Sequence, residues 1–271
     1  MHWLAKILDQ NSFPILQILY NNILGRIEKV GVFIIYIKNI WMQMLRPPIR
    51  RKLIVQQIEF IGNQSLNIIL LTGLATGAVF GLQIGGIFTV FKAEGMIGGA
   101  TGIALATELA PLITGFLLAG RAGSAMTAEI ATMVVNEQVD AMEAMGVNPI
   151  HYLVVPRVLA SMIVMPFLCG IFMFIGVVGV YAVGIFVFLV DEGVFFEKLI
   201  GLVQASDVVK GLRKMFIFSI VISAISCHKG LHASKGAEGV GIATTNAVVR
   251  TLLVLLFADF VISFIQIRWL S

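Results

Sequence analysis

Long stretches without charge alternate with short polar segments along this chain. Residues 60–91 contain no charged side chain, and neither do residues 158–190. As helices rising about 1.5 Å per residue, both stretches exceed the roughly 30 Å hydrocarbon core of a bilayer. Three further apolar stretches cover residues 95–120, 215–227 and 251–267. The pattern predicts an all-α integral membrane protein with five transmembrane helices.

Residues 30–45 are also apolar, but they lead into a basic cluster. Trp41 lies near their end, and the cluster consists of Arg46, Arg50, Arg51 and Lys52. This combination favours a helix lying in the membrane interface, with a sixth span as the alternative. We therefore expect a cytoplasmic N-terminus with an interfacial helix over residues 1–52 and one transmembrane domain over residues 53–271.

Lysine and arginine set the expected orientation. With five spans, the N-terminus and residues 121–157 share one side of the membrane, and the C-terminus lies on the other. Most of the cations fall on the N-terminal side, which predicts that this side is cytoplasmic. The cations assigned to the opposite side are Lys92, Lys198, Lys210, Arg213, Lys214 and Arg268.

Composition supports the membrane assignment. Hydrophobic residues make up 58% of the chain and charged residues 13%, against about 25% charged in soluble domains. The net charge of +4 reflects topology and anionic lipid rather than a nucleic-acid partner. Cys169 and Cys227 lie in or beside apolar stretches without regular spacing, so we interpret both as packing residues and expect no metal site.

Residues 121–157 form a charged, helix-forming island between two apolar stretches. The pattern predicts a short amphipathic helix over residues 136–146, starting at Asn136 as its cap and ending at Gly146. It could dock a partner or fold back on its own bundle. The acidic arc of this helix consists of Glu137, Asp140 and Glu143, and the apolar arc of Val139, Met142 and Met145.

The first span has a glycine at every fourth position, which lets another helix approach closely. The close partner is either the same chain or a second copy. An overlapping face of bulky residues is typical of core or lipid contact, with a hydrophobic substrate cavity as the alternative. The glycine ladder is Gly73, Gly77, Gly81 and Gly85, and the bulky stripe is Phe80, Ile84, Ile87, Phe88 and Phe91.

Glu108 lies within an apolar span, where a carboxylate costs on the order of 2.5–3.5 kcal/mol on insertion scales. Such residues generally face a polar cavity or partner. Pro111 leaves the carbonyl of Thr107 without its helical donor and concentrates polarity there. The alternative is a structural hydrogen bond to a neighbouring helix. The same argument applies more weakly to Asp259.

Catalytic motifs are weak in this sequence. His228 and His232 have the spacing of a zinc helix but lack the glutamate of a metalloprotease motif. The glycine-rich residues 235–245 lack the GK[ST] ending of a Walker A loop, and no nucleophile elbow is present. We conclude that the chain does not itself hydrolyse ATP.

Three segments resemble the MlaE/YrbE family of permease subunits, which belong to ABC transporters that work with MCE proteins. They are ELAPLITGFLLAGRAGSAMTAEI (108–130), NEQVDAMEAMGVNPIHYLVVPRVLA (136–160) and GIATTNAVV (241–249). The likeness covers roughly residues 50–268.

The resemblance implies a homodimer in the bacterial inner membrane that moves phospholipid to or from a periplasmic MCE hexamer and so maintains outer-membrane lipid asymmetry. A cytoplasmic ATPase dimer, which binds the ATP and Mg²⁺, and a STAS-domain subunit complete the complex, and the permease itself needs no cofactor. The implied ATPase contacts are Glu137, Asp140, Met142, Glu143 and Met145. The implied lipid contacts are Phe80, Ile87, Phe88, Phe91 and Glu108.

One position departs from the family pattern. Family members commonly have an arginine directly before the glutamate, where this chain has Thr107. A cationic headgroup contact is therefore not carried over to this position, and Glu108 needs a different partner.

Two other classes of function remain open. An ion- or proton-coupled secondary transporter would use Glu108 and Asp259 as a relay. A non-transporting membrane anchor would only assemble partners, and substitutions in its cavity would leave lipid traffic unchanged.

Overall fold

The computed structural model describes residues 28, 31–47 and 50–269, and it divides the chain into two units, Met1–Pro47 and Pro48–Ser271. In the first unit, residues 31–44 are helical, which is close to the extent expected for the interfacial helix. The lipid surroundings of this helix remain a prediction. Most of the expected cytoplasmic N-terminus lies outside the described residues.

The second unit is helical wherever it forms regular structure, and the described residues contain no β-strand. Its α-helices are α3 (Arg51–Val90), α4 (Ile97–Ala104), α5 (Ala110–Leu118), α6 (Ser124–Val135), α7 (Gln138–Ala144), α8 (Val155–Phe186), α9 (Glu192–Leu202), α10 (Ala205–Leu231) and α11 (Ala237–Trp269). A 3-10 turn, η1 (Glu94–Met96), precedes α4, and three π-helical turns, η2 (Leu105–Leu109), η3 (Ala119–Gly123) and η4 (Ile150–Val154), interrupt the longer helices.

Four helical stretches in the described residues are long and apolar enough to cross a membrane: Arg51–Val90, Glu94–Val135, Ile150–Phe186 and Ala237–Gln266. The first is one unbroken helix of 40 residues. The fifth span, expected around residues 215–227, lies inside α10. That helix has 27 residues but includes several charged side chains near its start, so the five-span count remains a prediction.

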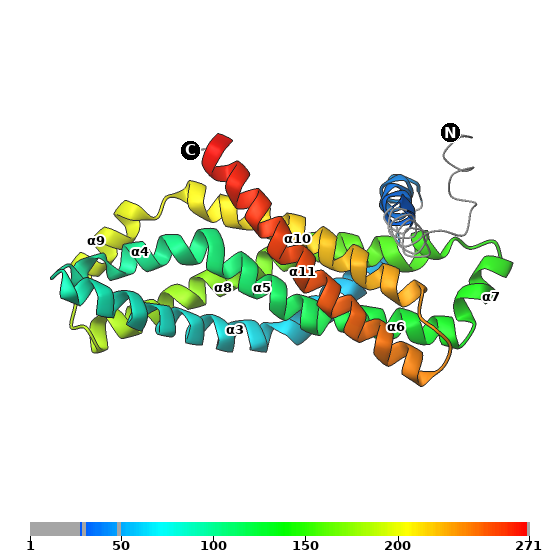
Figure 1. The fold of residues 1–271 in the computed structure, drawn as a ribbon, viewed down its shortest axis with the longest axis horizontal. Helices are drawn as coiled ribbons and strands as arrows, with labels where there is room; N and C mark the ends of the chain where they lie inside the picture. Colours follow the sequence, from blue (N-terminus) through cyan, green and yellow to red (C-terminus); the bar gives the residue numbers. More distant parts are fainter. Residues whose placement is uncertain (1–27, 29–30, 48–49, 270–271) are drawn as a thin grey trace, which may run out of the picture. The chain divides into compact units, whose positions relative to one another are not determined.

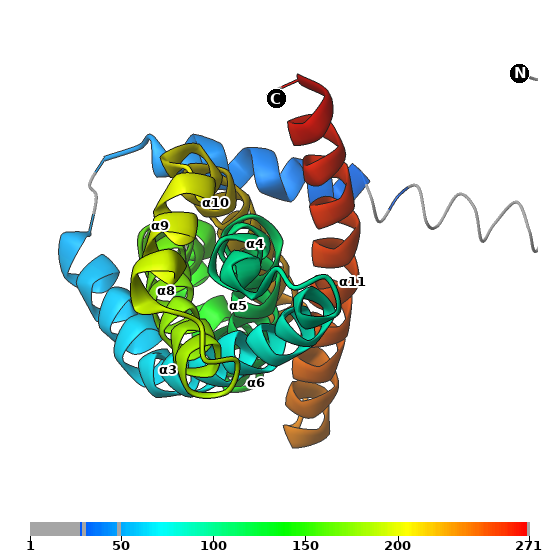
Figure 2. The same cartoon turned by 90° about the vertical axis from the view of Figure 1, so that its left-hand side faces the viewer.

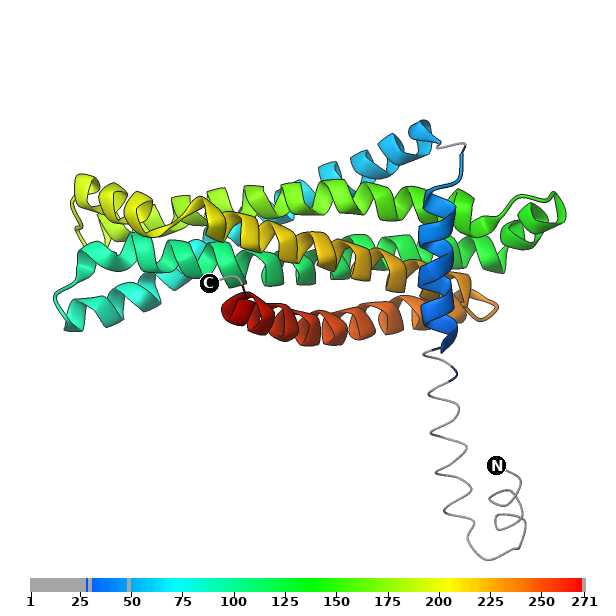
Figure 3. The ribbon, with the colours of Figure 1, turned by 90° about the horizontal axis from the view of Figure 1, so that it is seen from above.

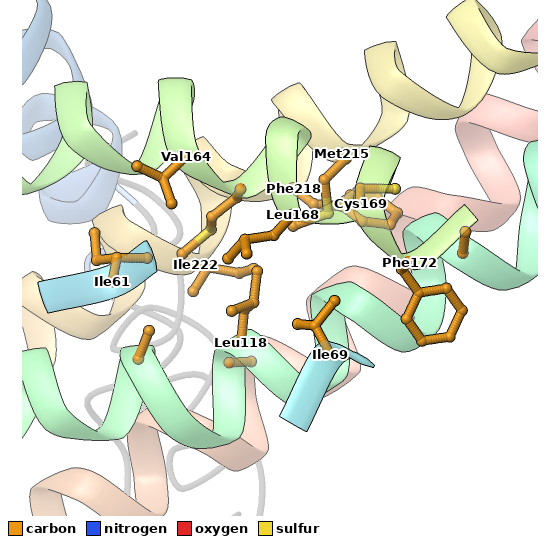
Figure 4. Packing of buried hydrophobic residues seen from close by; sticks show 14 of the residues in the cluster. Ile61, Ile69, Leu118, Val164, Leu168, Cys169, Phe172, Met215, Phe218 and Ile222 are labelled. Carbon is orange, nitrogen blue, oxygen red and sulfur yellow. The ribbon is translucent and has the colours of Figure 1, made fainter. Parts of the chain in front are cut away.

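The core of the bundle is apolar and lies where α3, α5, α8 and α10 meet. Ile69 of α3, Leu118 of α5, Phe172 of α8 and Phe218 of α10 are fully buried within one cluster. Figure 4 shows these side chains converging from the four helices, with Cys169 among them. Cys169 and Cys227 are both buried free thiols, as expected of packing residues.

The glycine ladder forms the buried face of α3 and lies against α8 of the same chain. A Cβ atom built on Gly77 would lie 1.9 Å from the carbonyl oxygen of Gly176, and one on Gly179 would lie 2.4 Å from the carbonyl oxygen of Leu74. The two backbones therefore touch where both helices lack side chains. This contact places the close partner of the ladder within the chain.

The short helices lie at opposite ends of the second unit. In Figure 1, α7 projects beyond α6 at one end, and α9 lies with α4 at the other. The end-on view in Figure 2 shows α11 along the edge of the bundle, and Figure 3 shows its C-terminal end stopping partway along the neighbouring helices. In the apolar 18-residue stretch that marks α11 as a candidate span, only 11% of the residues are buried. The corresponding value for the span that contains α8 is 50%, so α11 is the least enclosed candidate span.

The backbone contact between α3 and α8 can be tested with alanine substitutions. We expect Gly77→Ala to destabilise the protein by about 1–3 kcal/mol, because the new methyl group must displace the backbone of Gly176. Gly81→Ala is the matched control, since its Cβ would lie 3.4 Å from the nearest atoms of Val180 and Val183. Thermal unfolding of the purified variants in detergent measures the difference, and equal midpoints for both would contradict a backbone contact at Gly77.

Candidate functional site

A buried lysine joins three helical elements in the interior of the bundle. The side chain of Lys214 on α10 has no exposed surface, and its Nζ forms an ion pair with Oε2 of Glu108 and another, at 3.2 Å, with Oδ1 of Asp259. Nζ also donates to Oγ of Ser263 at 2.7 Å, and this oxygen lies 3.2 Å from Oε2 of Glu108. These four side chains are called the Lys214 cluster below.

Local backbone features bring the Lys214 cluster together. Glu108 lies in the π-helical turn η2, just before Pro111, which cannot donate to the carbonyl of Thr107. Asp259 and Ser263 are four residues apart and so share one face of α11. On α10, a Cβ at Gly211 would lie 2.1 Å from the carbonyl oxygen of Ala106, so a glycine is needed for α10 to approach η2.

The Lys214 cluster has one positive and two negative groups. Its net formal charge is therefore negative when all three are ionised. The lysine is fully enclosed and the carboxylate of Asp259 is 16% exposed, whereas the side chain of Glu108 is 45% exposed. The open edge of the cluster is thus an acceptor, suited to a hydroxyl or ammonium donor.

Thr107 does not supply the missing cationic contact. Its Oγ1 donates to the carbonyl oxygen of Ile103 at 2.9 Å within its own helix. The partner that Glu108 requires is Lys214, one of the cations that the sequence analysis counted on the side of the membrane opposite the N-terminus. The side of the membrane assigned to it remains a prediction, but α10 begins at Ala205, which places Lys210, Arg213 and Lys214 within a helix.

A helical pattern in the sequence could have located Lys214. Gly211, Lys214, Met215, Phe218 and Ile222 follow the i, i+3, i+4, i+7, i+11 spacing of one helix face, and all five are buried. The lysine therefore shares the face that packs into the bundle. No comparable signal marks Ser263, because one serine in an apolar span is common and its partners come from distant segments.

The bulky stripe lies along the C-terminal part of α3 and its cap residue Phe91, whereas the Lys214 cluster is held by η2, α10 and α11. Ile87 and Phe91 are exposed, Phe80 is half-buried, and Phe88 packs against the apolar cluster that includes Ile97 and Phe195. The polar partners of Glu108 come instead from α10 and α11. The stripe and Glu108 therefore contribute separate surfaces, one apolar and one polar.

The expected amphipathic helix is present as α7, but its start differs from the expectation. Asn136 ends α6, and Glu137 adopts a left-handed conformation with φ of 58° before α7 begins at Gln138. The prediction that Asn136 caps α7 is wrong, because α6 runs directly into a tight two-residue turn. The end is confirmed: Gly146 has φ of 74°, and its N–H donates to the carbonyl of Glu143.

The two arcs of α7 differ in exposure. Glu137, Asp140 and Glu143 are exposed, while Val139 is buried. Met142 is half-buried, and Met145 is 72% exposed at the end of the helix. The helix thus rests on the bundle through part of its apolar arc and presents its carboxylates and one methionine outward.

Two arginines that the sequence analysis did not single out brace the bundle on either side of α7. Arg157 is buried, pairs with Oε2 of Glu129 at 2.7 Å and donates to the carbonyl oxygen of Leu153 at 2.7 Å. Arg121 donates to the carbonyl oxygen of Phe60 at 2.9 Å and so ties η3 to α3. Each arginine lies beside an apolar stretch, and this position could have identified both from the sequence.

His228 and His232 stack with ring centroids 4.3 Å apart at the end of α10. Nδ1 of His232 lies 2.8 Å from the carbonyl oxygen of His228. Within the described residues, no group of three or more potential metal ligands is formed.

A helical bundle with four stretches long and apolar enough to cross a membrane has the architecture of a multi-pass membrane protein. The model of the family Permease MlaE matches residues 54–265, which is most of the chain. The protein therefore belongs to the MlaE family and is an ABC transporter permease.

Similar proteins occur in several lineages. A probable ABC transporter permease protein of Rickettsia typhi is 39% identical over 87% of this chain and 91% of its own length. A probable ABC transporter permease protein of Synechocystis is 36% identical over 84% of this chain and 87% of its own length. The chloroplastic protein TRIGALACTOSYLDIACYLGLYCEROL 1 of Arabidopsis thaliana is 36% identical over 82% of this chain and 63% of its own length.

Replacing Lys214 tests whether its ion pairs stabilise the protein. We expect Lys214→Met to destabilise the protein by about 3 kcal/mol, the lower end for a broken buried pair, because Glu108 remains partly solvated. Adding Glu108→Gln and Asp259→Asn to that variant should recover much of the loss, since no unpaired charge remains. Thermal unfolding midpoints of the three proteins check this, and a triple variant no more stable than Lys214→Met would contradict the charge argument.

Proposed function

We propose that this chain is the permease of a phospholipid ABC transporter, acting as a homodimer in the bacterial inner membrane with a periplasmic MCE hexamer, a cytoplasmic ATPase dimer and a STAS-domain subunit. The observation that supports a lipid cargo best is the Lys214 cluster, a polar site with one open carboxylate inside an apolar bundle. Such a site suits an amphipathic molecule. The name of the chloroplastic relative contains the name of a glycolipid, which agrees with a lipid cargo.

The polar and apolar surfaces would bind different parts of the lipid. The exposed carboxylate of Glu108 accepts hydrogen bonds from the headgroup, while Lys214, itself held by Asp259, fixes its orientation. Acyl chains lie along the stripe of Phe80, Ile87, Phe88 and Phe91, two of which are exposed. Dispersion and burial of apolar surface hold the chains there.

Coupling to ATP would pass through α7. The partner ATPase binds ATP and Mg²⁺, and its closure moves α7 as a rigid element against α6. The residues proposed to contact the ATPase are Glu137, Asp140, Met142, Glu143 and Met145. Because closed and open states of the ATPase place α7 differently, nucleotide binding biases the bundle between two arrangements.

The proposed topology counts α10 as the fifth span. Its buried charge is compensated by Glu108 and Asp259, so Lys214 does not prevent insertion. With α10 included, α7 is cytoplasmic and the C-terminus periplasmic. This arrangement agrees with the basic residues near the start of α3.

A conservative change at Glu108 tests the cargo site. We expect Glu108→Gln to assemble normally, because Lys214 keeps its pair with Asp259, and to lower phospholipid transport by about tenfold through loss of a charge-assisted hydrogen bond. Transfer of a labelled phospholipid between vesicles containing the full complex and vesicles containing the MCE protein measures the effect. Glu59→Gln, which changes an exposed glutamate of α3, is the matched control.

The outcome separates three interpretations. Normal assembly with native transport would refute the cargo role of Glu108. Loss of assembly would show that the glutamate is structural. Transport driven by an ion gradient without the ATPase, and lost in Glu108→Gln, would favour the ion-coupled transporter, for which two carboxylates sharing one lysine would serve as the relay.

Charge reversal on α7 tests the docking role. We expect the triple change of Glu137, Asp140 and Glu143 to Lys to abolish most co-purification of the ATPase, because three exposed carboxylates become cations facing a basic groove. Single exposed charges are worth too little to show this. A thiol introduced at Met145 should also react with an impermeant reagent in inverted membrane vesicles but not in intact cells.

The matched control reverses three acidic residues at the opposite end of the bundle, Glu94, Glu192 and Glu197. It changes net charge equally and should leave ATPase binding intact. Unaltered co-purification and ATPase stimulation in the α7 variant would remove this helix from the coupling role.

A further inference from the structure

The hydrogen-bond donors of the Lys214 cluster are all engaged within the chain. The ammonium of Lys214 has three N–H groups. Its partners are Oε2 of Glu108, Oδ1 of Asp259 at 3.2 Å and Oγ of Ser263 at 2.7 Å. The single hydroxyl hydrogen of Ser263 has the carbonyl oxygen of Asp259 as its nearest acceptor, at 2.8 Å. Because the lysine also has no exposed side-chain surface, it offers no donor to a ligand.

The carboxylate of Glu108 is the group that the cluster leaves open. Its side chain is 45% exposed, against 16% for Asp259. Within the described residues, Oε1 of Glu108 has one hydrogen-bond partner, the hydroxyl of Ser263 at 3.3 Å, although a carboxylate oxygen can accept two hydrogen bonds. The neighbouring hydroxyl of Thr107 donates to the carbonyl oxygen of Ile103 and so supplies no donor either. The open edge can therefore accept hydrogen bonds but not donate them.

The charges of the cluster act in the same direction. One ammonium is shared by two carboxylates, so the group is anionic when all three are ionised. On the same helix as the lysine, Lys210 is engaged by Asp207 at 3.0 Å, and Arg213 is exposed on another face. A phosphate carries negative charge and only acceptors, so it would be repelled by Glu108 without forming a hydrogen bond there. The phosphate is therefore the part of a phospholipid that this site excludes.

We propose that this site selects a phospholipid whose headgroup carries a primary ammonium, and that Glu108 binds the ammonium. The inference rests on the proposed function, because it requires that Glu108 contacts the cargo. A primary ammonium has three N–H donors and a positive charge, so it matches an ionised acceptor in both respects. A trimethylated ammonium keeps the charge but has no N–H group, and a glycerol headgroup keeps hydroxyl donors but leaves the lipid anionic. Among these three headgroups, ethanolamine should bind best.

Binding of three lipids to the full-length permease tests the selection. Phosphatidylethanolamine, phosphatidylcholine and phosphatidylglycerol with identical acyl chains are offered in equal amounts in detergent micelles, and native mass spectrometry counts the lipids that the protein retains most tightly. We expect about tenfold more phosphatidylethanolamine than either competitor, the ratio expected for a charge-assisted hydrogen bond. The comparison with phosphatidylcholine measures the contribution of the N–H donors, and that with phosphatidylglycerol measures the contribution of charge.

Two variants separate the donor effect from the charge effect. In Glu108→Gln both preferences should fall to near one, because the anionic acceptor is gone. In Asp259→Asn the acceptor remains while one negative charge is removed. The preference over phosphatidylcholine should then persist, and the preference over phosphatidylglycerol should weaken. Glu59→Gln, which neutralises an exposed glutamate of α3 outside the cluster, is the matched control and should keep both preferences.

Transport measurements distinguish this inference from the proposed function. Equal retention of the three lipids by the wild type, in a complex whose phospholipid transport still depends on Glu108, would overturn the headgroup selection and leave the cargo role intact. Transport that Glu108→Gln does not affect would instead refute the cargo role, and the headgroup inference would fall with it.

Two binding results would also overturn the selection. A wild-type preference for phosphatidylglycerol would mean that the site presents a free donor or cation. A preference for phosphatidylethanolamine that survives in Glu108→Gln would mean that another group recognises the headgroup. If Glu108→Gln does not fold, the wild type and Asp259→Asn decide, and an undiminished preference over phosphatidylglycerol in Asp259→Asn would contradict the charge argument.

Discussion

The need to neutralise one buried cation shapes the interior of this permease. Lys214 has no exposed side-chain surface, and an unpaired ammonium in a low-dielectric interior costs several kcal/mol. Its two carboxylate partners come from η2 and α11, so both elements must meet α10 at the same level of the bundle. The requirement accounts for Gly211, whose missing side chain lets α10 reach the carbonyl of Ala106. The π-helical turn that holds Glu108 lies at the same place.

Two different interactions join the helices on the two sides of the bundle. Between α3 and α8, the glycine ladder and its counterparts on α8 allow backbone contact, and close van der Waals packing joins helices where lipid offers no hydrophobic driving force. On the other side, α11 is largely exposed, and its polar ties to the interior include the side chains of Asp259 and Ser263. The first contact is extended and apolar, and the second is local and ionic.

The sequence predicted the features that depend on local pattern. Apolar stretches located four spans that the structure reproduces, and the spacing of acidic and apolar residues located α7. The glycine spacing indicated close packing but left its partner open, because a repeat on one helix does not identify the facing helix. The cap at Asn136 was wrong because α6 extends to Val135 and takes Asn136 as its own end. The ion pairs of Lys214 were not predicted because its partners lie 106 and 45 residues away in the chain.

In the proposed cargo role, the placement of Glu108 links ligand binding to helix position. Glu108 is the exposed member of a group in which Lys214 is shared between η2 and α11. A ligand group that bonds the carboxylate of Glu108 competes with Lys214 for the same oxygens, and the lysine must then rely more on Asp259 and Ser263. Because α11 is the least enclosed candidate span, the Lys214 cluster is one of the contacts that fix its position. If Glu108 binds the cargo as proposed, binding at the open edge of the cluster acts first on α11, which shares Lys214 with η2, and only then on the tightly packed pair of α3 and α8.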